Sequence, residues 1–155
     1  MPLPDFDSTG ILPPGLHAAP LAEVLIRFGT GSDARQRQAE LLRHVAGATA
    51  NYPTIKRILV WGSFVTSQPE PNDLDYSIVV SITHKWAQIA AAHRRFLLPF
   101  DARLHYGADV GYLAIPDYPL DRYVQLLDFL CHTRTLSSCG IVEISLWGEN
   151  KEESL

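Results

Sequence analysis

The chain has 155 residues, of which 46% are hydrophobic and 19% are charged. This length suits a single domain, and this composition supports a globular core and argues against a disordered chain. The net charge of −4 argues against broad, non-specific adhesion to nucleic acid, which needs a strongly positive surface.

Targeting and metal-binding signals are also sparse. No apolar stretch has the length needed to cross a bilayer, and the first residues lack the basic start and apolar core of a signal peptide. We therefore expect a cytoplasmic protein with no membrane partner. The two cysteines, Cys131 and Cys139, form no CxxC pair and the histidines form no HExxH motif, so no zinc site is expected.

The N-terminal part of the chain predicts an arm followed by two helices. Residues 1–19 are rich in proline and glycine and predict an extended arm laid over the domain, or a flexible lead. Pro20 begins a short amphipathic helix over residues 21–28. Ser32 has the position of an N-cap for a second helix that continues to about residue 50.

The remaining sequence alternates apolar runs with helical patterns. Strands are predicted over residues 56–61, 74–82, 108–115 and 141–147, and helices over residues 83–98 and 117–132. The elements interleave without a regular βαβ period, which favours an α+β domain with a mixed sheet of about four strands flanked by helices. We expect this domain to span residues 20–148 and a charged tail to occupy residues 149–155.

The most informative segment joins the first two predicted strands. Gly62 and Ser63 directly follow the apolar run that ends at Trp61, and Asp73 and Asp75 open the next strand. Glycine lets backbone N–H groups approach a phosphate closely, and the Ser63 hydroxyl adds a donor. Two aspartates at i and i+2 of an extended chain point to the same side, so both carboxylates can bind one hard cation.

A third carboxylate is expected from a neighbouring strand. Asp109 lies near the start of the strand over residues 108–115, at a position whose parity suits the same site. Three aspartates beside a phosphate cradle suit nucleotidyl transfer, in which two Mg²⁺ (or Mn²⁺) ions stabilise the attacking and the leaving oxygen. The predicted catalytic and metal-binding residues are Asp73, Asp75 and Asp109, and the predicted phosphate-binding residues are Gly62 and Ser63.

This pattern resembles the nucleotidyltransferase superfamily related to DNA polymerase β. Its signature is an apolar residue, Gly, Gly or Ser, a variable spacer, and then Asp-apolar-Asp/Glu-apolar. The chain supplies Trp61-Gly62-Ser63, nine intervening residues and Asp73-Leu74-Asp75-Tyr76. The similarity covers about residues 55–115 and is greatest to small, minimal prokaryotic members, some of which act in toxin–antitoxin or phage-defence pairs.

The resemblance implies a nucleotidyltransferase-like fold with an NTP as substrate and Mg²⁺ as cofactor. Asp73 and Asp75 would be the two motif carboxylates and Asp109 the third. The leading hypothesis is an enzyme that transfers NMP from an NTP to a hydroxyl group of a protein or RNA acceptor. The alternative is a non-catalytic binding module that keeps the fold and acts through a protein partner. A nuclease or phosphatase is disfavoured, because no further base or nucleophile motif is seen.

Several cations could offset the negative charge of Glu70, which lies in the spacer. Lys85, Arg94 and Arg103 are candidates, although each is more simply interpreted as a surface cation. The pair Arg35 and Arg37 is likewise interpreted as part of a solvated helix face.

Overall fold

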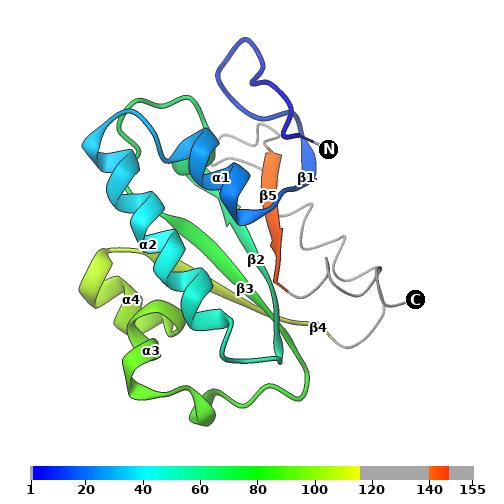
Figure 1. Cartoon of the computed structure of the whole chain (residues 1–155), viewed down its shortest axis with the longest axis vertical. Coiled ribbons are helices and arrows are strands. Elements are labelled where there is room, and N and C mark those ends of the chain that lie inside the picture. The colour runs from blue at the N-terminus through cyan, green and yellow to red at the C-terminus, as the bar shows by residue number, and fades with distance from the viewer. Residues whose placement is uncertain (1, 116–139, 147–155) are drawn as a thin grey trace.

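The structure, a computed structural model, describes residues 2–115 and 140–146 of the chain. In these ranges the chain forms a five-stranded mixed sheet with the order β1-β5-β2-β3-β4 (Figure 1). The strands are β1 (Gly15–Ala18), β2 (Ile55–Trp61), β3 (Asp75–Ser81), β4 (Asp109–Ile115) and β5 (Gly140–Ser145). A mixed sheet flanked by helices agrees with the predicted α+β class, but the number of strands is five rather than four.

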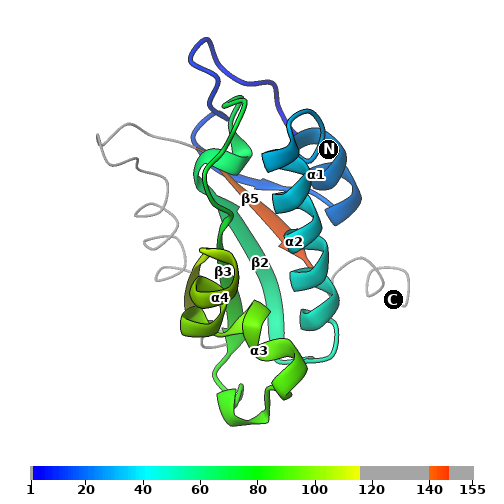
Figure 2. The same ribbon diagram turned by 90° about the vertical axis from the view of Figure 1, so that its left-hand side faces the viewer.

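The described helices share one core with the sheet. They are α1 (Leu21–Phe28), α2 (Asp33–Thr49), α3 (Ala91–Leu97) and α4 (Pro99–Tyr106), with short 3-10 turns η1 (Gly62–Val65) and η2 (Trp86–Gln88). Figure 2 shows α1 and α2 on one side of β2 and β5. Alternate strand residues reach this core, as the two-residue period of a strand requires: Ile58, Val60, Tyr76, Ile78, Val142 and Ile144, packed with Val24, Phe28, Leu42 and Val45 of the helices.

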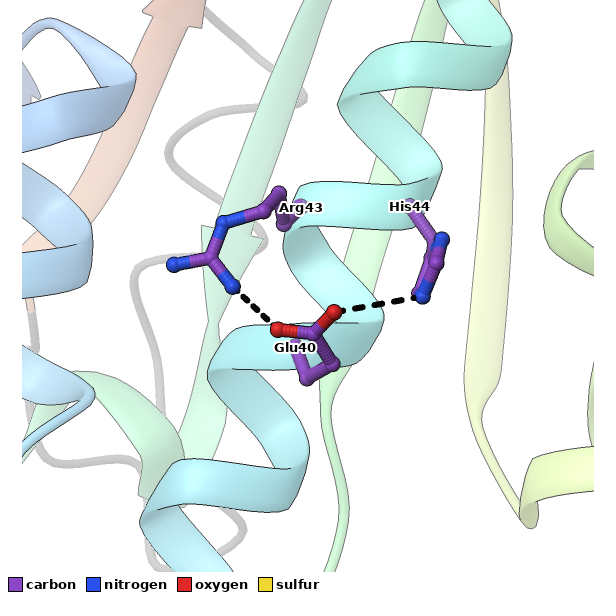
Figure 3. A network of polar contacts seen from close by, with 3 residues as sticks. All are labelled: Glu40, Arg43 and His44. Carbon is purple, nitrogen blue, oxygen red and sulfur yellow. Dashed lines mark hydrogen bonds and ion pairs between the residues drawn. The ribbon is translucent and has the colours of Figure 1, made fainter.

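Helix α2 has a capped start and a polar outer surface. Ser32 is its N-cap, as predicted, and the Ser32 Oγ accepts a hydrogen bond from the Arg35 backbone N–H at 3.3 Å. On the exposed side, Glu40 pairs with Arg43 and with His44, one turn away in each case (Figure 3). Such exposed pairs add little stability, so the buried side of α2 holds it in place.

Strands β3 and β4 run parallel, and the crossover between them carries α3 and α4. A parallel pair needs such a crossover, because a tight turn reverses the chain and would make the next strand antiparallel. Leu98 is extended with ψ of 133°, as the residue before a proline tends to be, and Pro99 then begins α4. The sequence predicts no helix over residues 99–106, because a proline directly after a helical pattern usually ends the helix, and α4 is therefore an element that the prediction lacks.

The predicted helix over residues 83–98 is shorter than expected. Only α3 and the single turn η2 are helical in this segment. The Tyr52 hydroxyl accepts a hydrogen bond from the Ala90 backbone N–H at 2.8 Å and shares another with His93 Nδ1 at 2.6 Å. These tertiary contacts fix the start of α3 at Ala91, a constraint that local helix propensity does not contain.

Part of the predicted N-terminal arm belongs to the sheet. β1 pairs in parallel with β5, with Gly15 opposite Gly140 and Ala18 opposite Glu143. Leu3 and Leu12 of the same segment are buried. The predicted helix over residues 117–132 and the tail over residues 149–155 lie outside the described residues. No helix within the described ranges is both long and apolar enough to span a membrane.

Candidate phosphate and metal site

Three strand ends meet at one end of the sheet. Trp61, the last residue of β2, pairs with Asp75, the first residue of β3, and Asp75 pairs in turn with Asp109, the first residue of β4. Adjacent strands are about 4.8 Å apart and a register pair occupies the same face of a sheet. The backbone therefore brings Asp75 and Asp109 together, as the strand parity predicts.

Gly62 lies directly beside the Asp75 carboxylate. Its φ of +78° is in the left-handed region, where glycine is strongly favoured over other residues. A methyl group at position 62 would overlap the Asp75 Oδ2 atom. The glycine is therefore required twice, once for the turn out of β2 and once for the space that Asp75 occupies. Ser63 follows in η1 and is half-buried.

Asp73 precedes β3 and lies on the other side of the buried Leu74. Asp73 is exposed and Asp75 is half-buried, while Leu74 is 1% exposed and belongs to the core. The Asp73 Oδ1 atom would be 3.6 Å from a methyl group placed on Gly107. Because Gly107 is two residues before Asp109, both aspartates of the Asp-x-Asp pair lie next to the start of β4.

The spacer between Gly62-Ser63 and Asp73 is held by polar side chains of α2. Ser32, Arg35 and Gln38 recur at intervals of three along one side of this helix, and we call them the α2 ladder. The Ser32 Oγ donates to the Pro69 carbonyl at 2.6 Å, and the Gln38 Nε2 donates to the Pro71 carbonyl at 2.6 Å. Each of these three side chains donates a hydrogen bond to a spacer carbonyl, which lies outside the sheet and the α-helices and so needs another donor.

Arg35 is the central rung of the ladder. Its Nη1 donates to the Phe28 and Phe64 carbonyls at 3.0 and 2.9 Å, and its Nη2 donates to the Thr66 and Gln68 carbonyls at 2.5 Å each. Arg35 is 7% exposed, which corrects its interpretation as part of a solvated face. Burial lowers the pKa of Arg35 from its ordinary value, although a guanidinium remains charged at neutral pH.

The spacing of apolar residues along α2 contains a signal that indicates the burial of Arg35. It lies four residues before the buried Ala39 and seven before the buried Leu42, which places it on the apolar stripe of α2. A charged residue on such a stripe needs buried polar partners, and the spacer carbonyls supply them.

The N-terminal segment contacts the spacer from another direction. The Ser67 backbone N–H donates to the Gly10 carbonyl at 2.8 Å, and Ile11 forms an isolated antiparallel bridge with Thr66. Asp7 stabilises this turn by accepting hydrogen bonds from the backbone N–H groups of Thr9 and Ile11. The hydrogen bond from the Thr9 hydroxyl, together with those from the backbone N–H groups of Ile11 and Thr9, lowers the pKa of the Asp7 carboxyl group. The segment therefore packs against the site loop.

A small cleft opens beside Asp73. Its volume is about 200 Å³, and its walls come from α2, the segment around residues 71–74 and the end of α4. Arg37, Gln38 and Tyr106 line it together with Asp73. The cleft gives an exposed route to the Asp73 carboxylate and places a cation, Arg37, on its rim.

The described side chains do not form a complete metal cage. Among them, no group of three His, Cys, Asp or Glu side chains is gathered closely enough to hold an ion. Of the three predicted ligands, Asp73 and Asp75 have described side chains, while Asp109 is described through its backbone register.

Of the cations considered from sequence, Lys85 lies far from the site. It follows β3, and β3 runs away from Asp75 for seven residues, about 20 Å. Arg94 lines a separate surface cavity with His105. Arg103 lies in the last turn of α4, one turn before Gly107, the residue that lies beside Asp73.

The family model of a family of unknown function, DUF6932, matches residues 4–145, which include the strands, the spacer and the aspartates described above. The chain belongs to this family. No curated protein and no solved structure matched the chain. The matched range begins within the N-terminal segment and ends at the last residue of β5, so this DUF6932 domain includes β1 as well as the rest of the sheet.

Proposed function

We propose that this DUF6932 chain is a Mg²⁺-dependent nucleotidyltransferase with a nucleotidyltransferase-like fold. It would transfer NMP from an NTP to a hydroxyl group of a protein or RNA acceptor, in a toxin–antitoxin or defence setting. The observation that carries the proposal is the register of three strand ends, which brings Asp75 beside Asp109 while Gly62 leaves space for the Asp75 carboxylate.

The donor set fits a hard divalent cation. Aspartate oxygens are the ligands that Mg²⁺ and Mn²⁺ prefer, and Asp73, Asp75 and Asp109 would supply them. The metal would neutralise phosphate charge and polarise the α-phosphate towards attack. Backbone N–H groups at Gly62-Ser63 would bind phosphate oxygens, because the positive φ of Gly62 turns the chain sharply where β2 ends.

The reaction would be an in-line displacement at the α-phosphorus. The acceptor hydroxyl oxygen forms the new bond to phosphorus, and the bond from the α-phosphorus to the bridging oxygen breaks. Pyrophosphate leaves with that bonding pair, and Asp109 takes the hydroxyl proton. The exposed position of Asp73 and the cleft beside it support access for an acceptor from solvent.

A non-catalytic binding module is the second candidate. The observation that favours it is the distribution of charge around the site. Glu70 is exposed in the spacer, and Lys85 lies beyond the opposite end of β3. A module of this kind would keep the fold and bind a protein partner without turnover.

Label transfer from α-³²P-NTPs tests the enzyme directly. The protein is incubated with each NTP, Mg²⁺ or Mn²⁺ and cell lysate, and labelled protein and RNA are separated. Asp75→Asn keeps the side-chain volume and removes the charge, so we expect transfer to fall by at least about a hundredfold. Asp101→Asn is the matched control, because Asp101 lies on α4 outside the proposed site, and its transfer should equal that of the wild type.

Calorimetry separates the two candidates. Metal-dependent NTP binding by the wild type, lost in Asp75→Asn, supports the enzyme. Wild-type protein that transfers no label above the level of Asp75→Asn with any NTP would refute turnover. If it also binds no NTP in the presence of metal, the binding module is the remaining function.

A further inference from the structure

We infer that Arg35 is a positioning residue for the phosphate site, an inference that rests on the proposed function. Through the α2 ladder it fixes the loop that follows Gly62-Ser63 and supplies positive charge beneath it. In Figure 1 this loop lies at the end of β2 near the N-terminal turns of α2. Arg35 contacts the loop from within the core and is not exposed to a ligand.

The hydrogen bonds of Arg35 set the direction of every second peptide group in the spacer. The carbonyls of Phe64, Thr66 and Gln68 all point to its guanidinium group. In a trans peptide the following N–H points the opposite way. The N–H after Thr66 belongs to Ser67, and it does point away, to the Gly10 carbonyl. One planar guanidinium group therefore orients alternate peptides of the spacer, a task for which its rigid fork of donors is suited.

The charge of Arg35 has no counter-ion within the described part of the chain. Its four hydrogen-bond partners are the neutral carbonyls of Phe28, Phe64, Thr66 and Gln68. A buried guanidinium group whose partners are neutral carbonyls keeps its net positive charge, because no carboxylate within the described residues neutralises it. The Phe64 carbonyl, at 2.9 Å, is one residue from Ser63. The positive charge of Arg35 would therefore attract an anion bound at Gly62-Ser63.

Arg35 acts on phosphate binding more than on metal binding. The Asp75 and Asp109 backbones are held by strand pairing, which Arg35 does not touch. The loop after Ser63, in contrast, depends on Arg35 at three of its carbonyls. A change at position 35 should therefore weaken binding of a metal–nucleotide complex while leaving the binding of the metal alone nearly unchanged.

Arg35→Lys tests this separation, because lysine keeps the charge but cannot reach four carbonyls with a planar fork. Dissociation constants are measured by calorimetry for Mn²⁺ alone and for Mn²⁺ with the NTP that the wild type binds most tightly. We expect nucleotide affinity to fall about tenfold and Mn²⁺ affinity to stay within about twofold. Arg43→Lys is the matched control, because Arg43 is an exposed arginine on the same helix, and both affinities should stay at wild-type values.

Ser32→Ala provides a second, milder variant if Arg35→Lys does not fold. It removes the hydrogen bond to the Pro69 carbonyl and the cap hydrogen bond from the Arg35 backbone N–H, and it keeps the Arg35 guanidinium group. We expect about a threefold loss of nucleotide affinity, again without a change for Mn²⁺ alone.

The outcomes are distinguishable. If the wild type binds Mn²⁺–nucleotide and folded Arg35→Lys binds it equally well, the positioning role of Arg35 is wrong and the proposed function stands. Equal loss of Mn²⁺ and nucleotide binding also overturns it, because that result indicates general loosening of the fold. If Arg35→Lys does not fold, the test rests on Ser32→Ala, and an unchanged nucleotide affinity in that variant overturns the positioning role. If the wild type binds no metal–nucleotide at all, the proposed function itself fails.

Discussion

At the scale of single residues, Gly62 combines two constraints that substitutions can separate. An alanine there carries the cost of a left-handed backbone, about 1–2 kcal/mol, and also overlaps the Asp75 carboxylate. Gly107 has a similar φ of +66°, but a methyl group there meets Asp73 only at ordinary contact distance. The two glycines therefore form a matched pair.

We expect Gly62→Ala to lower the free energy of unfolding by about 3 kcal/mol and Gly107→Ala by about 1 kcal/mol. Urea unfolding followed by circular dichroism measures both values. Equal losses would show that Asp75 moves aside freely. In that case Gly62 would be needed only for the turn.

His84 makes stability depend on pH. Burial lowers its pKa, its Nδ1 shares a hydrogen bond of 2.6 Å with Thr54 Oγ1, and its Nε2 has no partner within the described part of the chain. The folded state then resists protonation, while the unfolded chain binds a proton near pH 6.5. This contribution to stability is complete above about pH 6.5 and falls as the pH drops below it.

We expect His84→Gln to reduce the loss of stability between pH 7 and pH 5, because glutamine does not titrate. Urea midpoints of the wild type and of His84→Gln, measured at each pH, give the two slopes. A wild-type slope in His84→Gln would assign the pH dependence to other groups.

At the scale of elements, the N-terminal segment is part of the folded domain. Leu12 is 1% exposed, and its carbonyl accepts from the N–H of Gly140, the first residue of β5, at 3.1 Å. We expect Leu12→Ala to lower the free energy of unfolding by about 2–5 kcal/mol. Ile26→Ala, at a position that is 72% exposed, should change it by less than about 0.5 kcal/mol. Chemical denaturation of both variants checks this, and a small effect at Leu12 would mean that the segment is only loosely attached.

The starts of the strands and helices show what local sequence patterns can and cannot predict. β2, β3 and β4 begin within one residue of their predicted starts, because apolar runs bounded by glycine, proline and aspartate are local signals. β1 was missed because it has four residues and its partner lies at the far end of the described chain. The start of α3 depends on the Tyr52 hydroxyl, which no local window contains.

For the candidate site, the sequence predicts the positions that spacing and strand parity determine. Gly62, Asp75 and Asp109 meet because strand ends share a register. Arg35 was misinterpreted, because a charge on a helix is usually solvated and only the tertiary position of the spacer carbonyls explains its burial.

At the scale of the whole molecule, two parallel pairings hold the outer strands of the sheet. β4 joins β3 through α3 and α4, while β1 joins β5 from the opposite end of the described chain. The central antiparallel strands β5, β2 and β3 lie between these pairs. The candidate site is built on β2, β3 and β4, so it is framed by the central strands and by one of the two parallel pairs.

The pairing of Gly15 with Gly140 also has a consequence for synthesis of the protein. A ribosome adds about 5–20 residues per second, so β1 waits on the order of ten seconds before its partner has been made. Until then the edge of β2 that β5 will cover is unpaired, and Leu12 lacks its contact with Gly140. Nascent chains that stall before β5 should therefore be held by chaperones or degraded, because exposed strand edges recruit other chains.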